Sequence, residues 1–229
     1  LTKGMPMSSG LGSSAASSVA AAFGANLLAG SPLSRRELLP FTLESEKVAC
    51  GAAHADNAAP SLLGGFILIR SYEPLDIVKL PVPEGLAAAA AHPHTEIKTE
   101  DARRILRKEV RLADAVRQWG NLAALVAALY EGDLELLGRS LQDVVAVPRR
   151  AVLIPGFARV KAAALESGAL GCSISGSGPS VFALCGSDDL ARRAGAAMQE
   201  TFRSVGLECD LFVSRINPVG PVCLEKTGE

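Results

Sequence analysis

The sequence predicts an α+β protein. Apolar residues recur at the spacing of helices over long stretches, most clearly at 15–28 and 112–131. Two short apolar segments, 172–175 and 180–185, flank a glycine-rich turn and indicate adjacent strands. Because these strands follow one another without an intervening helix, the second half of the chain fits an α+β arrangement better than a doubly wound one.

The clearest break in composition lies at Pro81, Pro83 and Gly85. Proline and glycine end regular structure, and three of them within five residues indicate a linker. We therefore predict two domains, at residues 1–84 and 85–229.

The first domain is expected to begin with helices and to end with strands. An alanine-rich stretch predicts a buried helix that Gly30 terminates, and Ser34 and Glu37 have the spacing of a capping box that opens a second helix. Residues 51–60 are expected to form a loop. Strands are predicted at 66–70 and 77–80.

In the second domain, strands and helices are expected to alternate less regularly along the chain. Strands are predicted at 86–91, 172–175, 180–185 and 208–213. Helices are predicted at 100–110, 112–131, 134–143, 157–168 and from Asp188 or Asp189, as N-cap, to 205.

Composition excludes several classes of function. Hydrophobic residues make up 48% of the 229 residues, and the net charge is −1, with no basic run suited to nucleic acid or anionic membrane. The apolar runs are too short to span a bilayer. The 5 cysteines lack metal-binding spacing and suggest free thiols in a reducing compartment, namely Cys50, Cys172, Cys185, Cys209 and Cys223.

A glycine-serine loop close to residue 1 is the strongest functional signal. Gly10 and Gly12 allow close approach of backbone to phosphate, and the helix that follows offers unpaired N–H groups and a positive dipole end. The spacing differs from the commonest phosphate loop and from the dinucleotide fingerprint. An ordinary glycine-serine helix cap remains the alternative for this segment alone.

Several segments resemble the GHMP kinases, which are named for galactose, homoserine, mevalonate and phosphomevalonate. The stretch 6–15 is similar to the family's phosphate motif, and 171–180 is similar to its C-terminal glycine motif. The stretch 46–66, with Glu46, His54 and Asp56-Asn57, narrows the resemblance to the homoserine kinases. The resemblance implies a GHMP kinase fold, with an N-terminal ATP-binding domain and a ferredoxin-like C-terminal domain.

The resemblance also implies binding of ATP and Mg²⁺. The phosphates of ATP would lie on the loop, and the residues assigned to this cofactor are Pro6, Ser8, Ser9, Gly10, Leu11, Gly12, Ser13 and Ser14. Ser14 and Glu46 are the expected metal ligands, which suits the preference of Mg²⁺ for oxygen. Taken alone, Glu46 reads as a solvated helix residue, and Glu44 is an adjacent decoy.

The predicted substrate is L-homoserine. The resemblance assigns its contacts to His54, Asp56, Asn57, Arg103 and Arg150, of which the arginines suit a carboxylate. Gly176 and Gly178 are expected to form a structural turn that packs close to the phosphate loop. No dedicated catalytic base is assigned, because the homoserine kinases resembled here are thought to act without one, and no metal site is assigned to His92 and His94.

Other functions remain open at this point. Another GHMP kinase with a mevalonate-type or sugar substrate is the nearest alternative, and a non-catalytic ATP-binding member of the family is the second. The resemblance further implies a homodimer. It also implies a cytoplasmic location, or the plastid stroma for a plant or algal chain.

The phosphate loop stands unusually near the start of the chain. Because the family's first sequence motif is absent, we expect a truncated form. On its own it would have little kinase activity.

Overall fold

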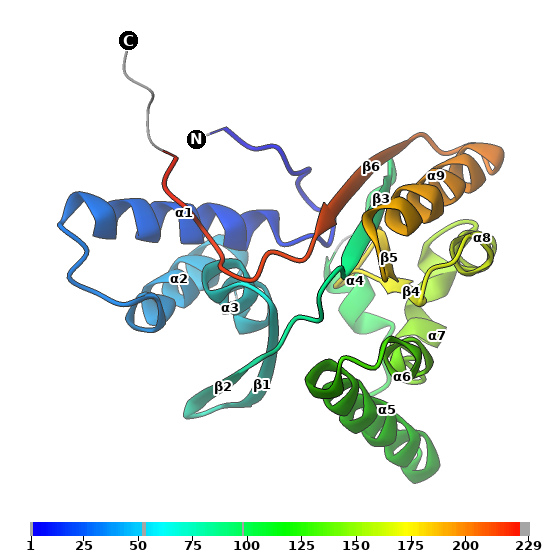
Figure 1. Cartoon of the computed structure of the whole chain (residues 1–229), viewed down its shortest axis with the longest axis horizontal. Helices are drawn as coiled ribbons and strands as arrows, with labels where there is room; N and C mark the ends of the chain where they lie inside the picture. Colours follow the sequence, from blue (N-terminus) through cyan, green and yellow to red (C-terminus); the bar gives the residue numbers. More distant parts are fainter. Residues whose placement is uncertain (1, 52–53, 98, 225–229) are drawn as a thin grey trace. The chain divides into compact units, whose positions relative to one another are not determined.

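The computed structural model describes residues 2–51, 54–97 and 99–224 (Figure 1). Contacts between Cα atoms divide the chain into two units. Unit 1 contains Leu1–Met7, Gly12–Pro81 and Asn217–Glu229, and unit 2 contains Ser8–Leu11 and Val82–Ile216. The domain boundary expected at residue 84 stays a prediction. Among the described residues, no helix is long and apolar enough to cross a membrane.

Unit 1 consists of three helices and a two-stranded antiparallel sheet. Its elements are α1 (Ser13–Leu28), α2 (Arg35–Cys50), α3 (Ala55–Leu63), β1 (Phe66–Tyr72) and β2 (Leu75–Leu80). The helices contact one another pairwise and enclose an apolar core of Ala15, Val19, Leu38, Leu39, Ala58, Ala59 and Leu62. Ser34 and Glu37 form the predicted capping box at the start of α2.

The loop expected at 51–60 is wrong, because α3 occupies most of it. Ala55, Ala58, Ala59 and Leu62 follow the spacing of one helical face, and all four are buried. Pro60 lies inside this helix and disfavours it locally. The burial of the apolar face outweighs that local preference.

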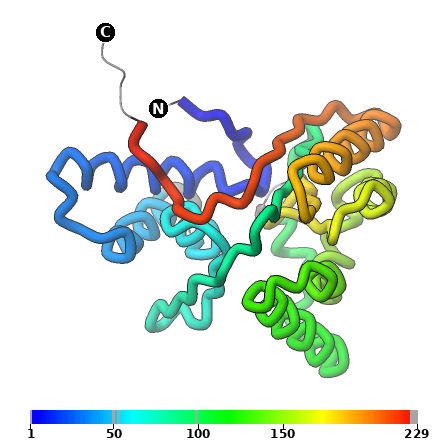
Figure 2. The backbone as a smooth tube through the Cα atoms, in the orientation of Figure 1, coloured from blue at the N-terminus to red at the C-terminus, as the bar shows by residue number. Residues whose placement is uncertain are grey.

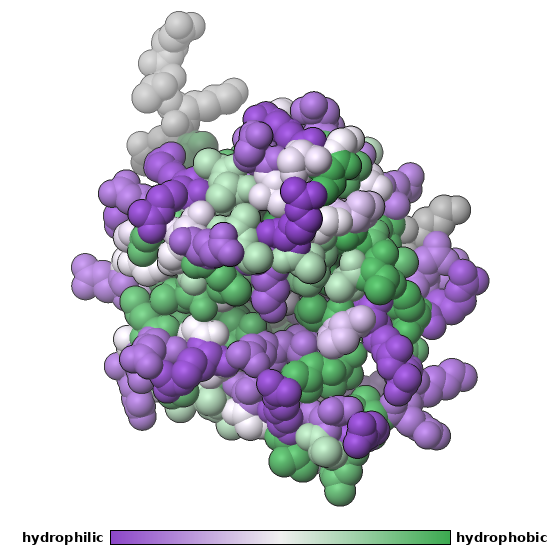
Figure 3. Space-filling model, turned by 90° about the vertical axis from the view of Figure 1, so that its right-hand side faces the viewer, coloured by the Kyte–Doolittle hydropathy of each residue, from purple (hydrophilic) through white to green (hydrophobic). Residues whose placement is uncertain are grey.

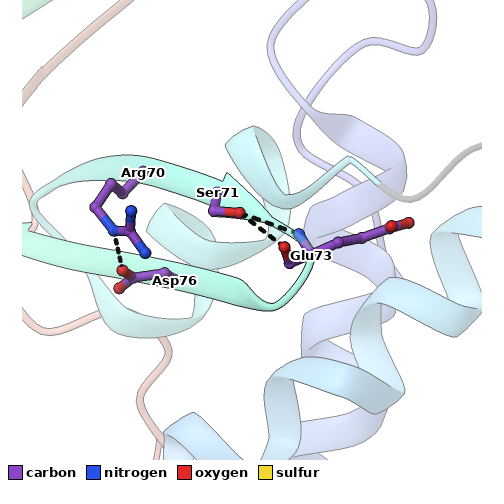
Figure 4. A network of polar contacts seen from close by, with 4 residues as sticks. All are labelled: Arg70, Ser71, Glu73 and Asp76. Atoms are coloured by element: carbon purple, nitrogen blue, oxygen red, sulfur yellow. Dashed lines mark hydrogen bonds and ion pairs between the residues drawn. The ribbon is translucent and has the colours of Figure 1, made fainter.

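The two predicted strands, β1 and β2, pair as an antiparallel hairpin, and polar contacts define its turn (Figure 4). The Ser71 hydroxyl donates to the carbonyl oxygen of Glu73 over 3.3 Å, and the backbone N–H of Glu73 donates to the same hydroxyl over 3.2 Å. Arg70 and Asp76 form an ion pair across the strands. The pairing shifts register between Ile69 and Ser71, which brings the end of β1 into the turn.

The segment from Asn217 to Leu224 packs within unit 1, where Figure 2 shows it as the red part of the tube. The N–H of Gly65 donates to the carbonyl of Asn217 over 2.7 Å, and Lys79 Nζ donates to the carbonyl of Pro218 over 2.7 Å. A Cβ on Gly64 would lie 2.4 Å from the backbone nitrogen of Gly220. Glycine is therefore required where this segment crosses.

Unit 2 is built on a four-stranded antiparallel sheet in the order β4-β5-β3-β6. The strands are β3 (Ala87–Pro93), β4 (Gly171–Ile174), β5 (Val181–Cys185) and β6 (Cys209–Arg215). Helices connect β3 to β4 and β5 to β6, whereas β4 and β5 are joined by a turn. This β-α-β-β-α-β order confirms the ferredoxin-like arrangement.

The helices of unit 2 are α4 (Thr99–Arg104), α5 (Leu112–Glu131), α6 (Leu134–Ser140), α7 (Val147–Arg150), the 3-10 helix η1 (Ala151–Leu153), α8 (Phe157–Glu166) and α9 (Asp188–Ser204). The helix expected at 100–110 is thus shorter than predicted. The N-cap of α9 is Ser187, whose side chain accepts from Leu190, and not Asp188 or Asp189. Serine in an extended conformation accepts this bond well, which leaves the two aspartates in the first turn.

Small side chains explain how α9 packs on the sheet. A Cβ on Gly195 would lie 3.1 Å from the Cβ of Ala89 and 2.7 Å from Leu211. Met198 and Phe202 fill the same interface and are fully buried. The alanines of β3 thus allow the helix to lie directly on the sheet.

Three of the cysteines are buried thiols in unit 2. Burial raises the pKa of Cys172 to about 12, and those of Cys185 and Cys209 to about 11. A thiol with so high a pKa is a poor nucleophile at neutral pH. These residues contribute to packing, while the side chain of Cys50 lies outside the described part of the chain.

His92 makes the stability of unit 2 depend on pH. The residue is 8% exposed, and its Nδ1 lies 3.1 Å from the Ser180 hydroxyl. Burial lowers the pKa of His92 below its ordinary 6.5, although Asp210 opposes this shift. The fold therefore favours the neutral ring, so stability is complete above pH 6.5 and falls as the pH drops below it.

We expect the free energy of unfolding, measured in urea at pH 7.5 and pH 5.5, to fall at the lower value. In a His92→Gln variant the fall should be smaller, because the group that must stay neutral is gone. Equal falls in both proteins would contradict this role for His92.

Candidate active site

The start of α1 presents the backbone groups expected for anion binding. Gly12 is the N-cap with φ of 78°, and the helix begins at Ser13. The first intrahelical bond runs from the N–H of Ala16 to the carbonyl of Gly12 over 2.9 Å. The N–H groups of the preceding turn therefore point out of the helix end, where its dipole is positive.

A buried carboxylate lies beside this first turn. Glu46 of α2 is 2% exposed, and the Ser14 hydroxyl donates to its Oε1. The Ser18 hydroxyl lies 3.4 Å from the same oxygen and 2.9 Å from the hydroxyl of Ser45. Glu44, the decoy, has a side chain 71% exposed and pairs with Lys47, so the two glutamates are clearly distinguished.

The donor set at this point suits a magnesium ion. A hydroxyl and a carboxylate oxygen are side by side, and both are hard ligands. A buried carboxylate that contacts neutral hydroxyls is also the kind of group that a cation stabilises. Ser14 and Glu46 therefore fit the metal that the resemblance implies.

The start of α3 brings three predicted substrate residues near Gly12. His54 is the N-cap, and Asp56 and Asn57 lie in the first turn. A Cβ on Gly12 would lie 3.3 Å from Asn57 Oδ1, so the Asn57 side chain packs against the α1 cap. His54 Nδ1 lies 3.9 Å from Asp56 Oδ1, and the Asp56 side chain is 61% exposed.

Tyr72 of the hairpin contacts this turn and was not predicted as a site residue. The backbone of Asp56 makes a hydrogen bond with Tyr72, and burial together with the charge of Asp56 raises the pKa of the Tyr72 hydroxyl. No spacing in the sequence relates Tyr72 to Asp56, because the contact depends on where the hairpin folds.

In unit 2, the loop residues Ser8 to Leu11 pack against the predicted glycine turn. The Ser175 hydroxyl donates to the carbonyl of Gly10 over 2.9 Å, and the N–H of Ser180 donates to the carbonyl of Ser9 over 3.2 Å. A Cβ on Gly10 would lie 2.4 Å from the Ser175 carbonyl oxygen. Gly10 is required by this approach.

The glycine turn itself has the backbone that the sequence analysis expected. Gly176 and Gly178 have φ of 55° and 85°, and a Cβ on Gly176 would lie 3.0 Å from the carbonyl oxygen of Gly10. Ser175 adds a hydroxyl contact that the sequence analysis did not identify. The sequence could not predict this contact, because a serine in a glycine-rich turn can donate to any backbone carbonyl that the fold brings near it.

The predicted arginines have different environments. Arg150 donates from Nε to the carbonyl of Ala102 over 3.1 Å and from Nη1 to the carbonyl of Gly176 over 2.8 Å. Arg103, the residue after Ala102 on α4, is exposed. Arg104 pairs with Asp101 over 2.9 Å. Arg150 thus joins α4 to the glycine turn through backbone atoms.

A hollow of about 250 Å³ lies next to α4 and is lined by Glu96, Ile97, Asp101 and Leu153. Two of its four lining side chains are acidic.

The remaining residues of the predicted phosphate loop differ in their exposure. Ser13 is buried, with its hydroxyl 3.4 Å from the carbonyl of Met5, Pro6 and Leu11 are half-buried, and Ser8 is exposed.

The chain matches known proteins along most of its length. Residues 1–65 match the GHMP kinases N terminal domain, and residues 125–204 match the GHMP kinases C terminal domain. A homoserine kinase of Chlorobium phaeovibrioides is 56% identical over 98% of this chain and 69% of its own length. The chain belongs to the homoserine kinases of the GHMP kinase family.

Further homoserine kinases support this membership. One from Xanthomonas campestris is 43% identical over 95% of this chain and 66% of its own length. The crystal structure of homoserine kinase from Cytophaga hutchinsonii is 56% identical, with a TM-score of 0.93 over 96% of this chain and 70% of that one. Mevalonate kinase of L. major, at 19% identity and a TM-score of 0.70, shares the fold.

Proposed function

We propose that this chain transfers the γ-phosphoryl group of ATP to the side-chain hydroxyl of L-homoserine and thereby forms O-phospho-L-homoserine. The observation that carries the proposal is the pair of Ser14 and buried Glu46 beside the N-terminus of α1. Phosphoryl transfer depends mainly on positioning and on charge stabilisation, and this arrangement offers both. Relatives that are 54–56% identical bear the name homoserine kinase.

The loop from Pro6 to Ser14 is the proposed binding site for the phosphates of ATP. Its backbone N–H groups and the α1 dipole would attract the phosphate oxygens. Ser14 and Glu46 would hold Mg²⁺, which neutralises phosphate charge when it is bound. Glycine at positions 10 and 12 keeps the backbone free of side chains that would block the phosphates.

The residues proposed to contact the amino-acid substrate are those that the resemblance indicated. They are His54, Asp56, Asn57, Arg103 and Arg150. The two carbonyl bonds of Arg150 hold its guanidinium in one orientation, which favours a precise contact with a carboxylate. Glu96 and Asp101, which line the hollow next to α4, give it the charge that attracts an ammonium group.

That acidic hollow favours an amino acid over the substrates of other GHMP kinases. Mevalonate and sugars carry no ammonium group and would gain nothing from the two carboxylates. We propose that proton transfer from the substrate hydroxyl uses no dedicated base, because the Asp56 carboxylate is 61% exposed and lies 3.9 Å from the His54 ring. A homodimer in the cytoplasm completes the proposal.

Substrate binding tests the assignment. In a chain joined to the N-terminal region of a homoserine kinase relative, and with Mg·ATP present, the KM for L-homoserine should rise about tenfold or more in Arg103→Ala, since a charge-assisted contact to the carboxylate is lost. Arg192→Ala is the control, because Arg192 is an exposed arginine of α9 in the same unit and is not among the proposed substrate contacts. Mevalonate should not be phosphorylated by either protein.

An equal KM in the Arg103→Ala variant and in the unmodified chain would remove Arg103 from the site. Turnover of mevalonate in place of homoserine would overturn the proposed substrate.

A further inference from the structure

His92 and Ser180 of unit 2 are buried polar residues to which the proposed reaction assigns no role. Hydrophilic side chains cover much of the face of the molecule drawn in Figure 3, where water solvates them. His92 is 8% exposed and Ser180 is fully buried, so their polar atoms must make hydrogen bonds within the protein. The two side chains bond to one another, between His92 Nδ1 and the Ser180 hydroxyl.

The sheet of unit 2 fixes the position of His92. The residue lies near the end of β3, where it pairs with Asp210 of β6. The preceding residue, Ala91, pairs with Val181, which is the first residue of β5. His92 therefore lies beside the point at which the glycine turn enters β5, and its ring is carried by a rigid element.

Ser180 connects this bond to the phosphate loop through its backbone. Its N–H donates to the carbonyl of Ser9 over 3.2 Å, and its own carbonyl accepts from the N–H of Ser175 over 2.9 Å. The Ser175 hydroxyl donates to the carbonyl of Gly10. Two consecutive carbonyls of the loop are thus held by residues whose positions depend on Ser180.

Holding a carbonyl also directs an N–H group. The carbonyl of Ser9 and the N–H of Gly10 belong to one planar trans peptide group and point in opposite directions. The bond from Ser180 to the Ser9 carbonyl therefore turns the Gly10 N–H away from Ser180. In the proposed function, this N–H is one of the groups that bind phosphate.

We infer that His92 and Ser180 are positioning residues for phosphate binding, because their buried hydrogen bond fixes the Ser180 backbone that orients the phosphate loop. The inference rests on the proposed function, in which the loop binds the phosphates of ATP. Neither residue has to touch ATP. A small rotation of the loop N–H groups weakens binding, because hydrogen bonds depend strongly on their angle.

Two other residues of unit 2 provide matched controls. His94 lies two positions after His92, but its side chain is 53% exposed and its Nε2 lies 3.1 Å from Asp210. Ser140 is 6% exposed, and its hydroxyl donates to the carbonyl of Leu136 over 2.7 Å, within one helix. Loss of either side chain should leave the phosphate loop in place.

The first test measures the loop itself, with no nucleotide present. Hydrogen exchange of the amides at 8–11 and 180 should be about fivefold faster in Ser180→Ala and in His92→Leu than in the unmodified chain. His92→Asn should restore slow exchange, because its amide can occupy the place of Nδ1 and bond to the Ser180 hydroxyl. His94→Leu and Ser140→Ala should exchange like the unmodified chain.

The second test measures binding of Mg·ATP in a chain joined to the N-terminal region of a homoserine kinase relative. The dissociation constant should rise about tenfold in Ser180→Ala and in His92→Leu, whereas the KM for L-homoserine should change by less than about twofold. Because the two residues act through one bond, the double variant should bind ATP no more weakly than either single variant.

Three results would overturn the inference. They are unchanged exchange of residues 8–11 in Ser180→Ala and His92→Leu, unchanged ATP affinity in both variants, and additive losses of ATP affinity in the double variant. A lack of Mg·ATP binding by the unmodified joined chain would instead overturn the proposed function, and faster exchange of the loop would still support the positioning role of His92 and Ser180.

Discussion

Replacing Glu46 by glutamine, in a chain joined to the N-terminal region of a homoserine kinase relative, should lower the rate of phosphoryl transfer to homoserine by about 10²–10³-fold. The amide keeps the size of the side chain and can still bond to the Ser14 hydroxyl, so the fold should be retained. What it loses is the negative charge, which a bound Mg²⁺ requires next to Ser14. The effect is large because Glu46 is buried and water cannot replace the missing ligand.

Binding measurements separate this role from a structural one. Calorimetry should show that added Mg²⁺ strengthens ATP binding to the unmodified chain and has little effect in Glu46→Gln. The control is Glu44→Gln on the same helix, since the Glu44 side chain is 71% exposed and pairs with Lys47. If both variants retain the magnesium effect, Glu46 is not a metal ligand.

The sequence predicted most elements whose pattern is long and uninterrupted. The bounds of α5 agree with the stretch 112–131, and the strands of unit 2 lie where alternating and apolar runs placed them. The failure at α3 has a physical cause. Pro60 and the polar residues His54, Asp56 and Asn57 disfavour a helix when the sequence is considered alone. The helix forms because the alanines on one of its faces are buried.

The candidate site could be predicted only in part. Ser14 and Glu46 lie 32 positions apart in the sequence. The resemblance to a family, and not their spacing, related them before the structure showed their contact. Tyr72 contacts Asp56, and Ser175 contacts Gly10. Neither pair lies within one helix or strand, so no sequence periodicity could have predicted these contacts. The contacts of Arg150 could not be predicted either. It donates to the carbonyls of Ala102 and Gly176, and every residue has a backbone carbonyl, so the residue types give no indication of these bonds.

Gly10→Ala should destabilise unit 2 by about 3–5 kcal/mol, which is near the upper limit for single substitutions. Two effects combine at this position. The φ of 78° is unfavourable for alanine, and the new Cβ would lie 2.4 Å from the Ser175 carbonyl oxygen and 2.8 Å from that of Gly178. Since both contacts are with backbone, a flexible side chain cannot move aside to relieve them.

The substitution that isolates the steric part is Gly206→Ala. Gly206 also belongs to unit 2 and has φ of 83°, but a Cβ there would meet nothing within 4 Å. It should cost about 1–2 kcal/mol from backbone conformation alone. Urea unfolding followed by Trp119 fluorescence reports on unit 2 for both variants. If both variants lose the same free energy of unfolding, the glycine turn yields to the new methyl group, and Gly10→Ala should then retain its affinity for ATP. If residues 175–180 hold the phosphate loop rigidly, Gly10→Ala should lose more free energy of unfolding than Gly206→Ala and should bind ATP more weakly.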